Sequence, residues 1–363
     1  MNRMKLFGTM GIVLLFLVAC SPAAETAPPV TQELPAYPLG ESGPYHVGMR
    51  TLKLVDESRE GRQLSVTVWY PAVPPADSTS TAATRDAEPD RSGEPYPLIL
   101  SSTTMANTLA LYVVSHGFTW VSVDGISSYT ALYEGAIDQP LDILFALDQV
   151  AAKPPEGLEG LIDAQNAGTI GYSFDGFNSL AMSGARVDPE YYLAQCPTPD
   201  ATTESILGSL SSFNCVPARD WGEFSAHVGE SITASQDGLW QPLTDPRIRA
   251  VMSMAGEGWW LFGERGLAAV DRPVLILVAT EDELYNENVL IYEHLGTSDR
   301  TLISFIGITH GGMLNTPYPE RMAHFAVAFF AYHLQGRADY AAYFSQEFVE
   351  QHDDLAWGVY EGD

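Results

Sequence analysis

A serine, an aspartate and a histidine follow one another along this chain in an order that fits nucleophilic catalysis. Ser173 lies in the hexapeptide GYSFDG at residues 171–176, Asp282 follows an apolar run, and His310 precedes two glycines. A serine hydroxyl is too weak to attack an ester alone, so it needs a base and an acid that orients the base. We therefore interpret Ser173 as a nucleophile, His310 as its base and Asp282 as the orienting acid.

The surroundings of Ser173 predict a strand, a sharp turn and a helix. An apolar run at residues 168–170 precedes the hexapeptide, and a helix-like run at residues 177–182 follows it. Such a turn exposes the hydroxyl at the end of a strand, and small residues are needed where the two backbones approach. Gly171 and Gly176 meet this need. Asp175 departs from the G-x-S-x-G pattern, which has glycine at that position.

The acid has two candidates. Asp282 comes directly after the strand-like run 273–278, and His310 follows another such run at 302–306, so both are expected on loops beyond strand ends. Asp282 also lies between two glutamates, which fits an exposed run of charge equally well. Glu257 follows the strand-like run that ends at residue 254 and is the rival acid.

Apolar runs alternate with helical patterns along most of the chain. A hairpin is expected from residues 50–54 and 64–70, and an exposed polar loop from residues 71–95. Further buried strands are expected at 97–100, 118–123, 250–254, 274–278 and 301–306, and helices at 107–115, 140–152, 261–270, 286–295 and 321–334. This alternation predicts an α/β fold whose mostly parallel sheet has helices on both faces.

Residues 188–245 interrupt the alternation between the helix after Ser173 and the next strand. We predict a cap-like insertion there, although an inert surface excursion has the same sequence pattern. The segment contains Cys196 and Cys215, which we expect to form a disulfide because the protein is expected to be exported.

The first residues indicate export. Residues 1–5 are basic, residues 6–19 are apolar, and LVAC at residues 17–20 resembles a bacterial lipobox, which predicts a signal peptide over 1–20 and lipidation of Cys20. The open alternative is an ordinary secretory signal. Residues 21–44 are expected to be a disordered tether, and the domain is expected to cover 45–363. Ser21 after the cysteine favours the outer membrane or the cell surface.

The net charge of −28 excludes the basic surfaces that nucleic-acid binding requires. The cysteines have no nearby histidine pair, so no zinc site is expected. Nothing in the sequence implies a metal or an organic cofactor. The expected partners are a small-molecule or lipid ester and, through Cys20, a membrane.

Several collinear segments between residues 47 and 334 resemble one family. They are 47–52, 66–72, 96–100, 115–118, 171–174, 245–251, 272–276 and 309–311. These segments resemble α/β-hydrolases of the bacterial branch related to platelet-activating factor acetylhydrolase and dienelactone hydrolase. The resemblance implies the α/β-hydrolase fold and a serine carboxylic-ester hydrolase that acts through Ser173, Asp282 and His310.

An oxyanion hole needs two backbone N–H donors. One is expected on Phe174, the residue after the nucleophile, and the family motif implies Met105 as the other. The motif has Ser-His-Gly or Ser-Pro-Gly before this donor, whereas this chain has serine and two threonines at residues 102–104. With Asp175, this departure supports an alternative function, a catalytically impaired hydrolase fold that binds or scaffolds at the cell surface. If the protein is an ester hydrolase, residues 259–262 are expected to line an acyl pocket or to pack beneath the insertion.

Overall fold

The computed structural model describes residues 36–76, 82–124, 134–196, 215, 218 and 220–362. The chain divides into two compact units, Met1–Ala36 and Tyr37–Asp363. The expected signal peptide, Cys20 and most of the expected tether lie outside the described residues. The boundary expected at residue 45 is too late, because Leu39 is buried and its backbone N–H donates to Nδ1 of His324 at 3.2 Å.

Ten strands form one sheet in the order β10-β9-β8-β7-β6-β4-β5-β2-β1-β3. The six strands from β9 to β5 in this order run parallel to one another. At the edges, β10 pairs antiparallel with β9, β2 pairs antiparallel with both β5 and β1, and β3 pairs parallel with β1. Their bounds are β1 His46–Asp56, β2 Arg62–Ala72, β3 Thr84–Arg85, β4 Tyr96–Ser102, β5 Thr119–Val123, β6 Ile162–Tyr172, β7 Ile248–Met254, β8 Val274–Ala279, β9 Arg300–Phe305 and β10 Leu355–Trp357.

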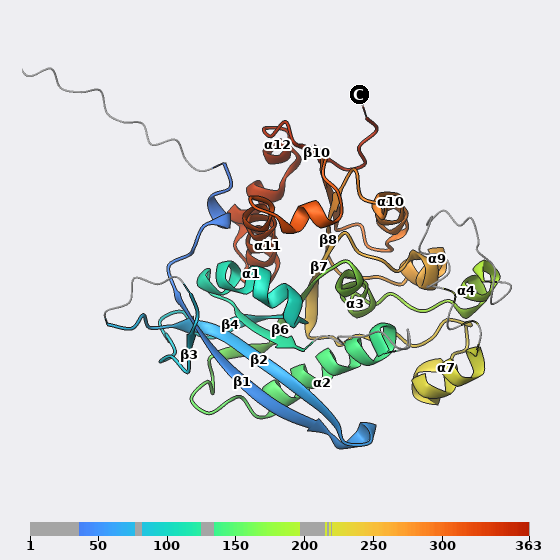
Figure 1. Ribbon diagram of the computed structural model, residues 1–363, viewed down its shortest axis with the longest axis horizontal. Coiled ribbons are helices and arrows are strands. Elements are labelled where there is room, and N and C mark those ends of the chain that lie inside the picture. The colour runs from blue at the N-terminus through green and yellow to red at the C-terminus, as the bar shows by residue number, and fades with distance from the viewer. Residues whose placement is uncertain are drawn as a thin grey trace, which may run out of the picture. The chain divides into compact units, whose positions relative to one another are not determined.

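Helices cover both faces of the sheet (Figure 1). The α-helices are α1 Thr103–Ser115, α2 Gln139–Ala152, α3 Phe174–Met182, α4 Pro189–Gln195, α7 Trp221–Val228, α8 Glu230–Thr233, α9 Trp259–Leu267, α10 Tyr285–His294, α11 Tyr318–Leu334 and α12 Gln346–Val349. Short helical turns are η1 Pro38–Gly40, η2 Glu57–Arg59, η3 Glu134–Asp138, η5 Gly311–Leu314 and η6 Ala338–Phe344. The expected mostly parallel α/β architecture is confirmed.

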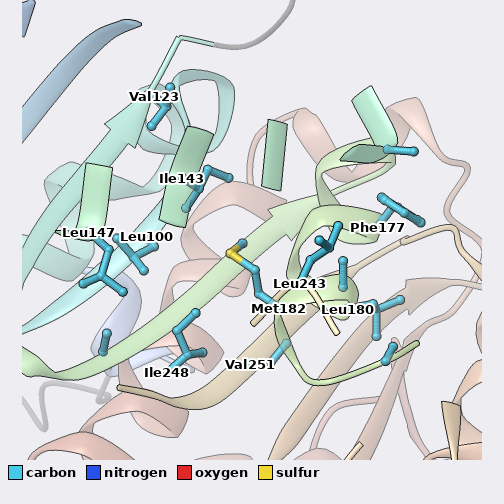
Figure 2. Close-up of a cluster of buried hydrophobic side chains, with 14 of the residues drawn as sticks. Leu100, Val123, Ile143, Leu147, Phe177, Leu180, Met182, Leu243, Ile248 and Val251 are labelled. Atoms are coloured by element: carbon cyan, nitrogen blue, oxygen red, sulfur yellow. The ribbon is translucent and has the colours of Figure 1, made fainter. Parts of the chain in front are cut away.

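Alternating strand residues divide the core into two layers. Leu98 and Leu100 of β4 face the layer that contains α2 and α3, whereas Ile99 faces the layer that contains α1 and α11. Figure 2 shows part of the first layer, in which Leu147 of α2 and Leu180 of α3 belong to the same buried cluster. Because successive strand side chains point to opposite faces, a fully apolar run such as that of β4 is buried on both sides.

The order of the strands reverses beside the nucleophile strand. The chain passes from β4 outward to β5, and then returns to place β6 on the other side of β4. In open parallel sheets, the crevice beyond the carboxyl ends of the strands at such a reversal is where ligands bind. The loops that follow β4 and β6 therefore meet at the position where a site is expected.

Several elements differ from their predictions. The helix expected over 107–115 begins at Thr103, immediately after β4. The strand expected at 301–306 is not the last, because β10 pairs with it at the edge of the sheet. The polar loop expected at 71–95 contains the short strand β3, which pairs with β1. Short edge pairings of this kind have little hydrophobic pattern by which a sequence could reveal them.

The expected disulfide is confirmed. Cys196 and Cys215 are joined with their Cα atoms 5.4 Å apart. The described part of the insertion also has an aromatic cluster, since Trp221 stacks on Trp240 and contacts Tyr192, whose ring meets the edge of Trp260 in α9. The insertion is therefore packed against α9, and its role as a cap over the site stays a prediction.

Candidate active site

Ser173 occupies the sharp turn between β6 and α3. Its backbone has φ 58° and ψ −125°, a conformation that costs energy in a residue with a Cβ atom. The turn leaves no room at either flanking glycine, because a Cβ on Gly171 would lie 1.8 Å from the Asp175 carbonyl oxygen and one on Gly176 would lie 2.6 Å from the Gly256 Cα atom. The two glycines therefore have the role expected of them.

The structure brings the three predicted side chains together. Nε2 of His310 lies 2.9 Å from Oγ of Ser173, and Nδ1 of the same ring lies 2.8 Å from Oδ2 of Asp282. The Asp282 side chain is fully buried, whereas 22% of the His310 side chain is exposed. The other carboxylate oxygen of Asp282 accepts the backbone N–H of Leu284 at 2.8 Å. Both oxygens of the carboxylate are thus fixed, and the imidazole joins the carboxylate to the serine hydroxyl.

The carboxylate determines which ring nitrogen carries the proton. An ionised Asp282 can only accept hydrogen bonds, so Nδ1 of His310 must donate to it. Nε2 is then left as an acceptor facing the hydroxyl of Ser173. The hydrogen bond with Asp282 raises the pKa of His310, although burial acts in the opposite direction. This arrangement allows the imidazole to take a proton from the serine while its positive charge is stabilised.

Tyr172 holds the histidine loop and was not identified from the sequence. Its hydroxyl donates to the backbone carbonyl of His310, and the two rings lie 5.0 Å apart. Burial raises the pKa of this tyrosine, so it remains a neutral donor. In the sequence, only its position immediately before Ser173 could have indicated that it belongs to the site. The loop of His310 is thereby attached to the strand that ends at the nucleophile.

Glu257, the rival acid, is buried near His310 but makes no hydrogen bond to its ring. Its side chain makes no hydrogen bond to any residue within the described ranges, and 8% of the residue is exposed. Burial raises its pKa to about 7, and the neighbouring Asp282 adds to this rise whereas His310 opposes it. Asp282 is therefore the partner of His310 in this structure.

The loop that contains Glu257 is fastened from α10. Oε1 of Glu287 accepts the backbone N–H groups of Gly258 and Trp259 at 2.8 and 3.0 Å. The side chain of Asn288 exchanges two hydrogen bonds with the backbone of Gly256, at 3.1 and 2.9 Å. Burial raises the pKa of Glu287 to about 8. These two supporting residues were expected only as part of a helix, because neither belongs to a recognisable motif.

The two expected oxyanion donors lie at the starts of two helices. Phe174 is the first residue of α3, and Met105 lies in the first turn of α1. Amide groups in the first turn of a helix are directed outward, which suits them to negative charge. Thr103 and Thr104, which replace the motif's residues before this donor, have no positive φ, because α1 begins directly at Thr103.

The aromatic residues after β7 contribute to the core. Trp260 and Phe262 are 3% and 1% exposed, and both stack on Phe177 of α3. Trp259 contacts Tyr191 of the insertion. Packing beneath the insertion therefore accounts for these rings more directly than an acyl pocket does.

No protein-family model and no curated protein matches the chain. Within the described ranges, no group of three or more histidine, cysteine, aspartate or glutamate side chains is placed to hold a metal ion. In the same part of the chain, no helix is both long and apolar enough to cross a membrane.

Proposed function

We propose that this protein is a serine hydrolase with an α/β-hydrolase fold that cleaves carboxylic esters. The observation that carries the proposal is the continuous hydrogen-bonded connection from Ser173 through His310 to Asp282. The three residues come from three different loops at the carboxyl ends of β6, β8 and β9. A connection of this geometry is the arrangement by which unrelated serine hydrolases activate their nucleophile.

The geometry supports a two-stage reaction. In the first stage, Oγ of Ser173 attacks the ester carbonyl carbon as Nε2 of His310 takes the hydroxyl proton. The tetrahedral intermediate collapses, the alcohol leaves with the proton from His310, and Ser173 is acylated. In the second stage, water attacks the acyl carbon as Nε2 of His310 takes its proton, the bond from that carbon to Oγ breaks, and His310 returns the proton to Ser173 as the acid leaves. Asp282 stabilises the imidazolium, and the amides of Phe174 and Met105 are the proposed donors to the oxyanion.

A series of p-nitrophenyl esters with increasing acyl length tests this proposal. Wild-type protein is expected to hydrolyse them, and Ser173→Ala is expected to lower kcat by at least ~10³-fold. Ser92→Ala, at an exposed serine remote in the sequence from the three proposed catalytic residues, serves as the control and should retain wild-type kcat. Absence of hydrolysis by folded wild-type protein would instead favour the surface-binding alternative.

We also propose that the protein is exported and held at the cell envelope by a lipid on Cys20. The disulfide between Cys196 and Cys215 supports an oxidising compartment, where such bonds persist. Cys20→Ser is expected to move the protein from the membrane fraction to the soluble fraction while ester hydrolysis is retained. Recovery of that variant with membranes would contradict lipid anchoring.

A further inference from the structure

Ser102 has the backbone of a helix cap but does not use its side chain as one. It is the residue before α1, it has φ −73° and ψ 165°, and its side chain makes no hydrogen bond to the helix. A serine in this position usually accepts the N–H of the second or third helical residue. The third residue of α1 is Met105. The backbone N–H that Ser102 leaves uncapped is therefore that of Met105, the same group that the proposed oxyanion hole requires.

The hydroxyl of Ser102 is committed to a different partner. It donates to Oδ2 of Asp175, while Nδ2 of Asn178 donates to Oδ1 of the same carboxylate at 3.1 Å. Asp175 is the second residue of α3 and lies two residues after Ser173. The hydrogen bond therefore spans the reversal of strand order between β4 and β6 and joins the beginnings of α1 and α3 (Figure 1).

Within the described part of the chain, no other side chain replaces the missing cap at the beginning of α1. Oγ1 of Thr103 is hydrogen-bonded to Asp124 at 3.0 Å, at the end of β5. Ser101 accepts the indole N–H of Trp120 at 2.8 Å and donates to the carbonyl of Ser102. The neighbouring hydroxyls are thus engaged with other partners, and no described side chain caps the first turn of α1.

We propose that Asp175 is a positioning residue that withholds Ser102 from capping α1 and thereby leaves the Met105 amide available to the oxyanion. The inference rests on the proposed function. It gives a reason for one departure from the family pattern, because Asp175, which stands where the pattern has glycine, acts together with Ser102. It also predicts an unusual ranking of variants, in which removing both partners harms catalysis less than removing Asp175 alone.

The test compares kcat and KM for one p-nitrophenyl ester in four variants. Asp175→Ala frees Ser102 to cap α1, so kcat should fall by ~10²-fold, the usual loss for one oxyanion donor, with KM little changed. Ser102→Ala leaves the amide uncapped, so kcat should stay within about fivefold of wild type. In the Ser102→Ala/Asp175→Ala double variant, kcat should recover toward that of Ser102→Ala.

Asp175→Asn is the conservative variant. Its amide oxygen can still accept the hydroxyl of Ser102, so kcat is expected within about threefold of wild type. Circular dichroism and melting temperature establish that each variant is folded. If Asp175→Ala does not fold, Ser102→Ala still tests the inference, because a loss of ~10²-fold in that variant would overturn it.

The inference is overturned if Asp175→Ala keeps the wild-type kcat, if the double variant is no more active than Asp175→Ala, or if Ser102→Ala alone loses ~10²-fold. In each of these cases, wild-type hydrolysis leaves the proposed function standing. Wild-type protein that hydrolyses no ester would remove the proposed function and this inference together.

Discussion

The loops after β7 and β8 are neighbours at the same edge of the sheet, and each contains a buried acid. Asp282 is 6% exposed and Glu257 is 8% exposed. Asp282 is hydrogen-bonded to His310 and to its own loop, whereas Glu257 interacts with that histidine only through its charge. Burial near a histidine therefore does not distinguish an orienting acid from a bystander. The hydrogen bond to Nδ1 does.

The two loops are also fastened by different means. Asp282 stabilises its own loop by accepting the N–H of Leu284. The Glu257 loop is held from outside, by Glu287 and Asn288 of α10, which bond to backbone groups on either side of it. Glu257 is thus the only one of these acids whose side chain has no hydrogen-bonding role within the described residues. Burying the Glu257 carboxyl therefore costs free energy that no hydrogen bond within this part of the chain offsets, whereas the hydrogen bonds of Asp282 offset the cost of its own burial.

Neutralising each acid in turn gives the largest expected difference. Asp282→Asn should lower kcat by ~10⁴-fold, because the amide can donate to Nδ1 and so favour the wrong tautomer of His310. Glu257→Gln should change kcat by less than ~10-fold, because no hydrogen bond to the ring is lost. Steady-state hydrolysis of a p-nitrophenyl ester measures both. A larger loss in Glu257→Gln than in Asp282→Asn would reverse the assignment.

The pH dependence of activity gives a second, smaller contrast. His310 must be neutral to act as a base, and its pKa is raised chiefly by the hydrogen bond with Asp282. The acidic limb of kcat/KM should therefore lie above the ordinary histidine value of ~6.5, with about tenfold loss per pH unit below it. Nuclear magnetic resonance titration of His310 should show a much greater downward shift in Asp282→Asn than in Glu257→Gln. Equal shifts would mean that the hydrogen bond has no special effect.

Removing the disulfide tests whether the different effects of Asp282 and Glu257 on His310 depend only on the loops after β7 and β8. A Cys196→Ser/Cys215→Ser variant should lose roughly 3 kcal/mol of unfolding free energy, because the unfolded chain gains freedom. Denaturant unfolding measures this loss. The ratio of kcat between Asp282→Asn and Glu257→Gln should be the same in that background. A changed ratio would show that the insertion influences which acid supports His310.

The smallest expected effect is on stability. The pKa of Glu257 is raised from 4.5 to about 7 in the folded protein, so its proton is held more tightly there than in the unfolded chain. The contribution of Glu257 to the free energy of unfolding is greatest below pH ~4.5 and is lost as the pH rises through about 7. Glu257→Gln should therefore be more stable than wild type at pH 8 by on the order of 2 kcal/mol, and not at pH 4. A difference independent of pH would contradict the burial argument.

The strand positions and the three central side chains were predictable because each follows a simple rule. Apolar runs revealed β6, β8 and β9, and the residues just after them had to lie at one edge of a parallel sheet. The pair Ser102 and Asp175 was not predictable as a contact, because the two residues are 73 positions apart. In the sequence, Asp175 is only a departure from the G-x-S-x-G pattern, and Ser102 is only the serine before two unexpected threonines. The beginning of the domain was missed because Tyr37 and Leu39 lie in a segment rich in proline, and only tertiary packing against α11 orders them.

The most direct measurement of the central claim is covalent labelling of the wild-type protein with a fluorophosphonate, followed by peptide mass spectrometry. The account predicts one adduct, on Ser173, formed rapidly at pH 8 and slowly at pH 5, and abolished by His310→Ala with the fold intact. Folded wild-type protein that forms no adduct, or an adduct on another serine, would contradict it.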